Sequence, residues 1–117
     1  PIADFDERGF GQWEGLTADE IEAAFPEVWQ AWLEAPFEVT PPEAEVFSDF
    51  QTRVWTATDR LLDSTEESIA LVAHLGVLRL IYQHLVDREA VFWNIDIPQG
   101  RGLLLEERDQ TWQATLL

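Results

Sequence analysis

The sequence predicts an α/β fold around a mostly parallel sheet, and three observations lead to this class. Residues 68–73 (Ser-Ile-Ala-Leu-Val-Ala) form a short apolar run bounded by Glu66-Glu67, as in a strand buried on both faces of a parallel sheet. A helical pattern follows at once, as where helices connect parallel strands. Short apolar runs between turn residues in the last third of the chain predict further strands.

The N-terminal part predicts a loop followed by two short helices. Residues 1–16 mix glycine, aromatic and charged residues without a period, which indicates an irregular loop. Thr17 and Glu20 have the spacing of a capping box and predict a helix over 18–24. A second helix is expected over 27–34. Its apolar face holds Val28, Trp29, Trp32 and Leu33.

The middle of the chain predicts a loop and two longer helices. The loop covers 40–44, where Pro41 and Pro42 stand. Ser48 is a candidate N-cap for a helix over 49–62, and a further helix is expected over 77–86. The apolar stripe of the first of these two helices is Phe50, Val54, Ala57 and Leu61.

Three strands are expected in the last third, over 91–95, 102–107 and 112–116. The last two are separated by Asp109-Gln110 and predict a hairpin.

Length and composition predict one domain with an ordinary core. The 117 residues are 46% hydrophobic, contain no cysteine, and show no apolar run long enough to cross a bilayer. Disulfides, thiolate metal sites and cysteine nucleophiles are therefore excluded. No signal peptide is recognisable, and we expect a cytoplasmic protein.

The charge balance argues against two classes of partner. Twenty-three acidic residues face seven arginines and no lysine, for a net charge of −16. Such a chain lacks the basic footprint that nucleic acids and anionic membranes require. Two interpretations stay open: adaptation to a saline source, where salt screens the self-repulsion, or an ordinary acidic protein.

His74 is the first candidate site residue, because it ends the predicted strand 68–73 where the next helix begins. Ligands of open α/β sheets bind outside the carboxyl ends of the strands, and helix N-termini attract anions such as phosphate. The alternative is a histidine that only makes hydrogen bonds within its loop.

Three segments, in order, resemble the histidine phosphatase superfamily. Residues 7–16 (Glu-Arg-Gly-Phe-Gly-Gln-Trp-Glu-Gly-Leu) are similar to its E-x-x-F-G-x-W-E-G-L motif. Residues 44–54 are similar to its G-E-S-x-x-D-F-x-x-R-V stretch, and 71–79 to its V-x-H-G-G-V-I-R motif. The small alpha-ribazole and broad-specificity bacterial phosphatases are the most similar members.

The resemblance implies a three-layer α/β/α, phosphoglycerate mutase-like fold and a phosphomonoesterase acting on a small phosphate ester without metal or organic cofactor. The glutamate matching Glu7 is the family's general acid and then general base. We expect partial burial to raise its pKa; the alternative is a surface carboxylate paired with Arg8. The histidine matching His74 donates hydrogen bonds to the phosphoryl oxygens, and the backbone N–H of Leu75 also contacts the phosphate.

Two departures from the family pattern stand out. No Arg-His-Gly motif, the source of the family's nucleophilic histidine, occurs in these residues. We therefore expect the chain to be the C-terminal portion of a family domain, with the nucleophile and sheet neighbours of strand 68–73 on sequence that is not present. Leu75 replaces a glycine, so its side chain is expected to crowd the pocket and to strain any positive φ.

The other candidates receive structural interpretations. His84 is expected on the surface or in the core of its helix, Arg79 could reach an acidic partner as easily as a substrate, and Glu43 and Glu45 favour the next helix through its dipole. The tryptophans of 27–34 pack a core or flank a substrate entrance. The second functional hypothesis is a non-catalytic remnant that binds phosphate compounds or a partner chain, for instance as a homodimer through the exposed edge of its sheet.

Overall fold

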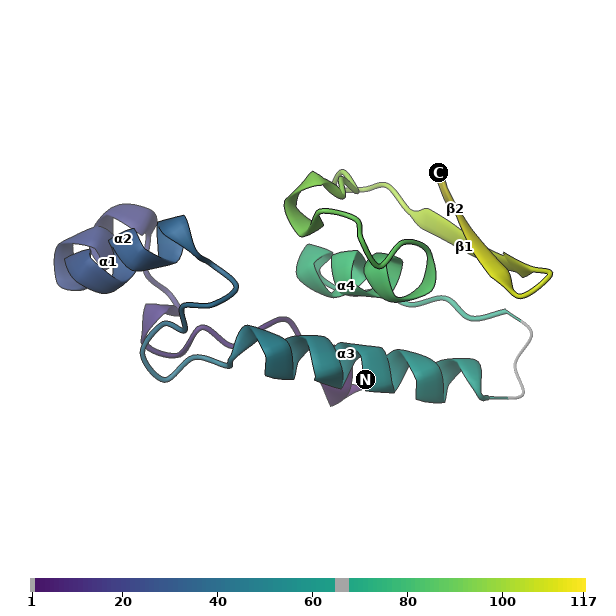
Figure 1. Cartoon of the computed structure of the whole chain (residues 1–117), viewed down its shortest axis with the longest axis horizontal. Coiled ribbons are helices and arrows are strands. Elements are labelled where there is room, and N and C mark those ends of the chain that lie inside the picture. The colour runs from purple at the N-terminus through teal and green to yellow at the C-terminus, as the bar shows by residue number, and fades with distance from the viewer. Residues whose placement is uncertain (1, 65–67) are drawn as a thin grey trace. The chain divides into compact units, whose positions relative to one another are not determined.

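The computed structural model describes residues 2–64 and 68–117, which fall into two units (Figure 1). One unit is Glu7–Arg53, and the other joins the N-terminal residues through Asp6 with Val54–Leu117. Each unit is described by itself. The expectation of one domain stays a prediction.

Unit Glu7–Arg53 contains a 3-10 turn, η2 (Gly11–Trp13), and two short helices, α1 (Ala18–Ala24) and α2 (Pro26–Glu34). The capping box at α1 is confirmed. The Thr17 hydroxyl accepts from the Glu20 N–H, and the Thr17 N–H donates to the Glu20 carboxylate, both at 3.2 Å. Helix α2 begins one residue before the predicted start because Pro26, with its fixed φ, suits the first helical position.

Three tryptophans of this unit pack together, with Trp13 buried and Trp29 and Trp32 half-buried. The Trp29 and Trp32 rings stack with centroids 5.8 Å apart, and Trp13 meets them at 5.6 and 5.7 Å. Core packing is therefore the observed role of the predicted aromatic face, whereas Leu33 of the same face is exposed.

Gly11 fixes how the N-terminal loop lies on the turn at 41–44. Its φ is +55°, and a Cβ there would stand 2.3 Å from the carbonyl oxygen of Pro42. The next N–H, of Gln12, donates to that same oxygen at 3.0 Å. Only glycine combines this φ with so close an approach of two backbones.

Helices α3 (Phe47–Leu62) and α4 (Leu75–Leu85) are the longest elements (Figure 1). Three residues of the predicted stripe of α3, Phe50, Val54 and Ala57, are buried, and the fourth, Leu61, is half-buried. Ser48 is not the cap, because α3 begins at Phe47 and takes Ser48 into its first turn. Within the second unit, the indole N–H of Trp55 on α3 donates to the carbonyl of Leu80 on α4 at 2.9 Å.

The predicted strand 91–95 is wrong. Residues Phe92–Asn94 form a 3-10 turn, η3, because the N–H groups of Asn94 and Ile95 bond locally to the carbonyls of Val91 and Phe92. The carbonyl of Ile95 accepts from Arg79 Nε at 2.8 Å, so this segment docks on α4 through a side chain instead of a strand partner.

The C-terminal hairpin is confirmed. Strands β1 (Leu103–Arg108) and β2 (Thr111–Leu116) pair antiparallel, with Leu103 opposite Leu116. The φ values of Asp109 and Gln110 are +53° and +65°, the twist that a two-residue hairpin requires. The α/β class is therefore confirmed, but the sheet found among the described residues is this antiparallel pair.

The predicted strand 68–73 carries no regular secondary structure. A strand is defined by a hydrogen-bonded neighbour, and no backbone hydrogen bond joins 68–73 to another described residue. Glu66-Glu67, taken as the boundary of this run, lie outside the described residues. The helices in the described part of the chain are all too short or too polar to cross a membrane.

Candidate functional site

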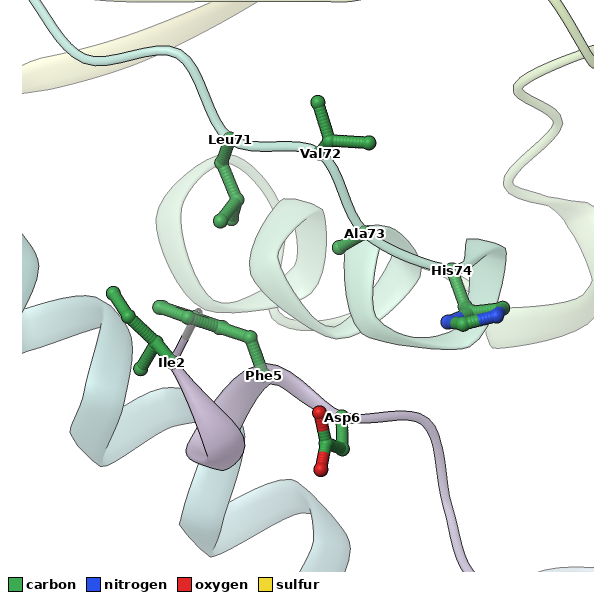
Figure 2. A pocket seen from close by; sticks show the side chains of 7 residues that line it. All are labelled: Ile2, Phe5, Asp6, Leu71, Val72, Ala73 and His74. Atoms are coloured by element: carbon green, nitrogen blue, oxygen red, sulfur yellow. The ribbon is translucent and has the colours of Figure 1, made fainter.

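A cavity of about 470 Å³ lies in the unit that contains His74 (Figure 2). Two segments line it, one just before Glu7 in the chain and one that leads into α4. The lining residues are Ile2, Phe5 and Asp6 from the first, and Leu71, Val72, Ala73 and His74 from the second. The cavity is therefore mainly apolar, with an imidazole and a carboxylate as its ionisable groups.

His74 is the N-cap residue of α4. Its backbone is extended, with φ −72° and ψ 159°, and its carbonyl accepts from the N–H of Leu78 at 3.1 Å. Its imidazole makes no capping hydrogen bond to α4. The side chain is exposed and lines the cavity. The first turn of α4 contains no acidic residue. An imidazole beside such a helix start can bind an anion such as a phosphoryl group.

Leu75 does not behave as predicted. It is the first residue of α4 and is absent from the positive-φ positions of the described chain, so the expected backbone strain does not arise. Its side chain is exposed and does not line the cavity. A helical Leu75 still presents its N–H at the start of α4, where N–H groups lack partners within the helix.

The side chains of the 71–74 segment alternate between half-buried and exposed. Leu71 and Ala73 are half-buried, whereas Val72 and His74 are exposed. Figure 2 shows Leu71 pointing toward Ile2 and Phe5, and Val72 pointing the opposite way. The segment thus has the side-chain alternation of a strand without a paired neighbour.

Asp6 is a lining residue that sequence reasoning missed. The only signal in the sequence was its position directly before Glu7, in the motif that resembles the phosphatases. Because Glu7 and His74 fall in different units, each is placed in its own surroundings.

Glu7 is half-buried, and its Oε1 accepts a hydrogen bond from the backbone N–H of Arg8 at 3.0 Å. The Arg8 guanidinium is buried, lies over the rings of Phe10 and Phe47, and donates from Nε to the carbonyl of Glu45 at 2.9 Å. Burial lowers the pKa of Arg8. The hydrogen bond to Glu7 Oε1 comes from the backbone N–H of Arg8, so it does not depend on the charge of the Arg8 side chain.

Glu45 is an organising residue that was expected to act through the helix dipole. Instead, its carboxylate accepts from Arg53 Nε at 2.9 Å and from Arg53 Nη2 at 2.8 Å. These hydrogen bonds lower the pKa of Glu45, against an opposing effect of burial. Glu43, its expected companion, occupies a turn position with φ +61°. The E-and-R spacing of the 44–54 motif was the available signal.

The remaining candidates have structural roles. His84 Nε2 lies 2.8 Å from Asp59 Oδ1, and its ring stacks on Trp55 with centroids 4.8 Å apart. His84 is therefore a helix-packing residue, as predicted. Arg79 donates to the Ile95 carbonyl and lies over the rings of Phe92 and Trp93, so these contacts join it to the 92–95 segment. No cluster of three metal-ligating side chains occurs in the described residues.

Sequence comparison connects the chain to a family and to longer proteins. The histidine phosphatase superfamily (branch 1) matches residues 2–117. The bifunctional protein Rv2228c of Mycobacterium tuberculosis is 33% identical over 85 residues, which are 72% of this chain and 23% of that protein. An uncharacterized protein of Mycobacterium bovis matches with the same values. The chain thus spans under a quarter of the length of these relatives.

Two solved structures share the fold. One, from Escherichia coli, is provisionally assigned as an alpha-ribazole-5′-P phosphatase, and the other is the alpha-ribazole phosphatase of Shigella flexneri. Each is 24% identical with a TM-score of 0.88, over 99% of this chain and 58% of the other. The match by family over 2–117, together with this fold, shows that the chain belongs to the histidine phosphatase superfamily.

Proposed function

We propose that the protein containing this chain is a phosphomonoesterase that hydrolyses a small phosphate ester, such as alpha-ribazole phosphate or a sugar phosphate. The observation that supports this most directly is His74, an exposed imidazole at the start of α4 that lines a cavity and is not used as a helix cap. Family membership supplies the reaction type. The net charge of −16 argues against a nucleic acid or an anionic membrane as the ligand.

In the first half-reaction, a histidine nucleophile forms a bond to phosphorus while the ester P–O bond breaks. Glu7 gives its proton to the leaving alcohol oxygen. His74 and the N–H of Leu75 donate hydrogen bonds to the phosphoryl oxygens, where charge develops. In the second half-reaction, ionised Glu7 takes a proton from water, whose oxygen bonds to phosphorus as the phosphorus–nitrogen bond to the histidine breaks. Inorganic phosphate leaves, and the histidine is restored.

The nucleophile of this proposal is the histidine of an Arg-His-Gly motif, which these 117 residues do not contain. His84 does not replace it, because its ring is engaged by Asp59 and Trp55.

The first test is hydrolysis of p-nitrophenyl phosphate by the protein isolated from its natural source, with its intact mass measured in parallel. We expect a mass above 13.5 kDa and activity that falls about 100-fold or more in His74→Ala. The matched control is His84→Gln, which changes the chain's other histidine outside the cavity and is expected to retain activity. Full activity of His74→Ala would contradict the role of His74, and an inactive protein of 13.5 kDa would contradict the proposal of an enzyme.

A second candidate function is binding of a partner chain, favoured by the 68–73 segment. Its backbone makes no hydrogen bond to another described residue, and Val72 is 98% exposed. Such a segment can accept a strand from an upstream part of the same protein or from a second copy. Analytical ultracentrifugation of the 117-residue chain tests this role. A dimer or aggregate supports docking of a second copy, and a stable monomer contradicts docking of a second copy.

A further inference from the structure

We propose that Glu45 is a positioning residue for Glu7, held in place by Arg53, so that the 44–54 motif orients the acid of the 7–16 motif. This inference rests on the proposed function, because it concerns the orientation of the proton donor. All of the contacts lie within the unit Glu7–Arg53.

Glu45 holds the two residues after Glu7 through three hydrogen bonds, two to the Gly9 backbone and one to the Arg8 side chain. The Glu45 N–H donates to the carbonyl of Gly9 at 2.9 Å, and the Gly9 N–H donates to Glu45 Oε1 at 3.4 Å. Arg8 Nε donates to the carbonyl of Glu45 at 2.9 Å. The two residues that follow Glu7 are therefore bound to a single residue of another segment.

Arg53 fixes the carboxylate that makes one of these bonds. Its Nε and Nη2 contact the two different oxygens of Glu45 at 2.9 and 2.8 Å, which is a bidentate pair. Both side chains are 23% exposed, so water competes weakly with the pair. A bidentate arginine fixes the plane of a carboxylate as well as its position. Oε1 of Glu45 is thereby aimed at the Gly9 N–H.

The link to Glu7 passes through Arg8. The Arg8 N–H donates to Glu7 Oε1 at 3.0 Å, while the Arg8 side chain is anchored on Glu45 and the rings of Phe10 and Phe47. The orientation of the Glu7 carboxyl group therefore follows the orientation of the 7–8 peptide. Proton transfer in the transition state demands such orientation, because a small displacement of the donor lowers the rate steeply.

The other loop carboxylate provides a contrast. Glu14 Oε1 accepts from the Phe10 N–H at 3.0 Å and is exposed. Its hydrogen bond is therefore to Phe10, beyond the 7–9 backbone that Glu45 contacts. Glu14→Gln is therefore a matched control: the same chemical change, in the same loop, on a carboxylate that also accepts a loop N–H.

The experiment compares two esters with the protein from its natural source. p-Nitrophenyl phosphate has a leaving group that needs no proton, whereas an alkyl phosphate depends on the general acid. Glu45→Gln is expected to lower kcat/KM about tenfold for the alkyl ester and less than about twofold for the nitrophenyl ester. Arg53→Lys, which keeps the charge but loses the bidentate geometry, is expected to shift the two esters in the same unequal way.

Three comparisons give each outcome a meaning. Equal loss on both esters in Glu45→Gln and Arg53→Lys, or no loss on either, overturns the positioning role, because a merely structural effect does not depend on the leaving group. Glu14→Gln is expected to treat both esters alike. Glu7→Gln must itself lose far more kcat/KM on the alkyl ester than on the nitrophenyl ester. If it does not, the proposed acid is wrong, whatever Glu45 does. If Glu45→Gln fails to fold, Arg53→Lys decides.

Discussion

The two candidate site residues are presented by segments of opposite character. Glu7 belongs to a loop whose backbone is bound at Gly9, Phe10 and Gln12 by partners within its own unit. His74 ends a segment, 68–73, without a backbone hydrogen bond to another described residue. The loop has no period in its sequence, yet it is well supported. The segment has a strand-like sequence, yet it lacks a strand's support.

This difference shows that the presence of hydrogen-bond partners, and not local propensity, decides whether the backbone of each segment is held by contacts with the rest of its unit. Loop 7–16 receives acceptors and donors from Pro42 and Glu45, which the chain itself brings to it. Segment 68–73 has β-branched and aliphatic residues but no donor or acceptor of a neighbouring strand in the described chain. A strand is a property of two segments, so its sequence alone is not sufficient.

The largest expected effect tests how strongly loop 7–16 depends on its contact with 41–44. Gly11→Ala places a Cβ 2.3 Å from the Pro42 carbonyl oxygen and at φ +55°. We expect a loss of roughly 2 to 5 kcal/mol in the free energy of unfolding, from the left-handed backbone and the displaced turn together. Urea unfolding followed by tryptophan fluorescence measures it, since Trp13, Trp29 and Trp32 belong to the same unit.

Gly15→Ala is the matched control for that substitution. Gly15 has a φ of +78°, but an added Cβ would meet nothing within 4 Å. Its cost is expected to be about 1 kcal/mol, from backbone conformation alone. Equal losses of stability in Gly11→Ala and Gly15→Ala would show that the close contact between Gly11 and Pro42 contributes little to stability. The contrast between loop 7–16 and segment 68–73 would then disappear.

An intermediate effect concerns the pH dependence of the hydrogen bonds that Glu45 makes with Arg53 and Gly9. Hydrogen bonds from Arg53 lower the pKa of Glu45 in the folded state. The ionised form is therefore favoured by folding, and its stabilisation is present above the ordinary pKa of a glutamate and lost as the pH falls through the lowered value. Glu45→Gln should cost about 1 to 2 kcal/mol at neutral pH, and this difference should shrink below about pH 4.

Thermal unfolding of the two proteins at neutral and at acidic pH measures that difference. Glu14→Gln serves as the comparison, because the exposed Glu14 carboxylate accepts a hydrogen bond from the Phe10 N–H and pairs with no arginine in the described residues. If Glu45→Gln lowers the stability by the same amount at both pH values, the contribution of Glu45 comes from the shape of its side chain and not from its charge.

Much of the fold was predictable because its signals are local. The Thr17–Glu20 capping box, the buried stripe of Phe50, Val54 and Ala57, and the hairpin at Asp109-Gln110 depend on residues within a few positions of one another. The errors lie where a distant partner decides. The 91–95 run became a 3-10 turn anchored by Arg79, and 68–73 found no neighbour among the described residues.

The position of His74 at a helix start was predictable, whereas the contacts that hold the Glu7 loop were not. His74 at the start of a helix followed from an apolar run next to a helical pattern, and the structure places it at the N-cap of α4. The role of Glu45 had one signal, the spacing of Glu45 and Arg53 in the 44–54 motif, but nothing in the sequence shows that Arg53 and Gly9 both reach its carboxylate. Leu75 was misjudged because the sequence does not show where the helix begins, and a helical first residue tolerates any side chain.

The smallest expected effect is at Val72, and it probes the 68–73 side of the comparison. Val72 is 98% exposed and lacks a backbone hydrogen bond to the other described residues. Val72→Thr, which keeps the branched shape, should therefore change the unfolding free energy of the 117-residue chain by less than about 0.5 kcal/mol. Its neighbour Leu71, half-buried against the cavity, should cost about 1 kcal/mol or more when changed to Ala.

The same Val72→Thr change distinguishes an idle segment from a docking strand. If 68–73 receives a strand from elsewhere, the substitution should weaken that association while leaving the isolated chain as stable as before, because a threonine hydroxyl is then buried in an apolar contact. Sedimentation of the wild-type and Val72→Thr chains over a concentration series measures this. Marked destabilisation of the isolated monomer by Val72→Thr would instead mean that the segment is already buried within its own chain, and the contrast with loop 7–16 would disappear.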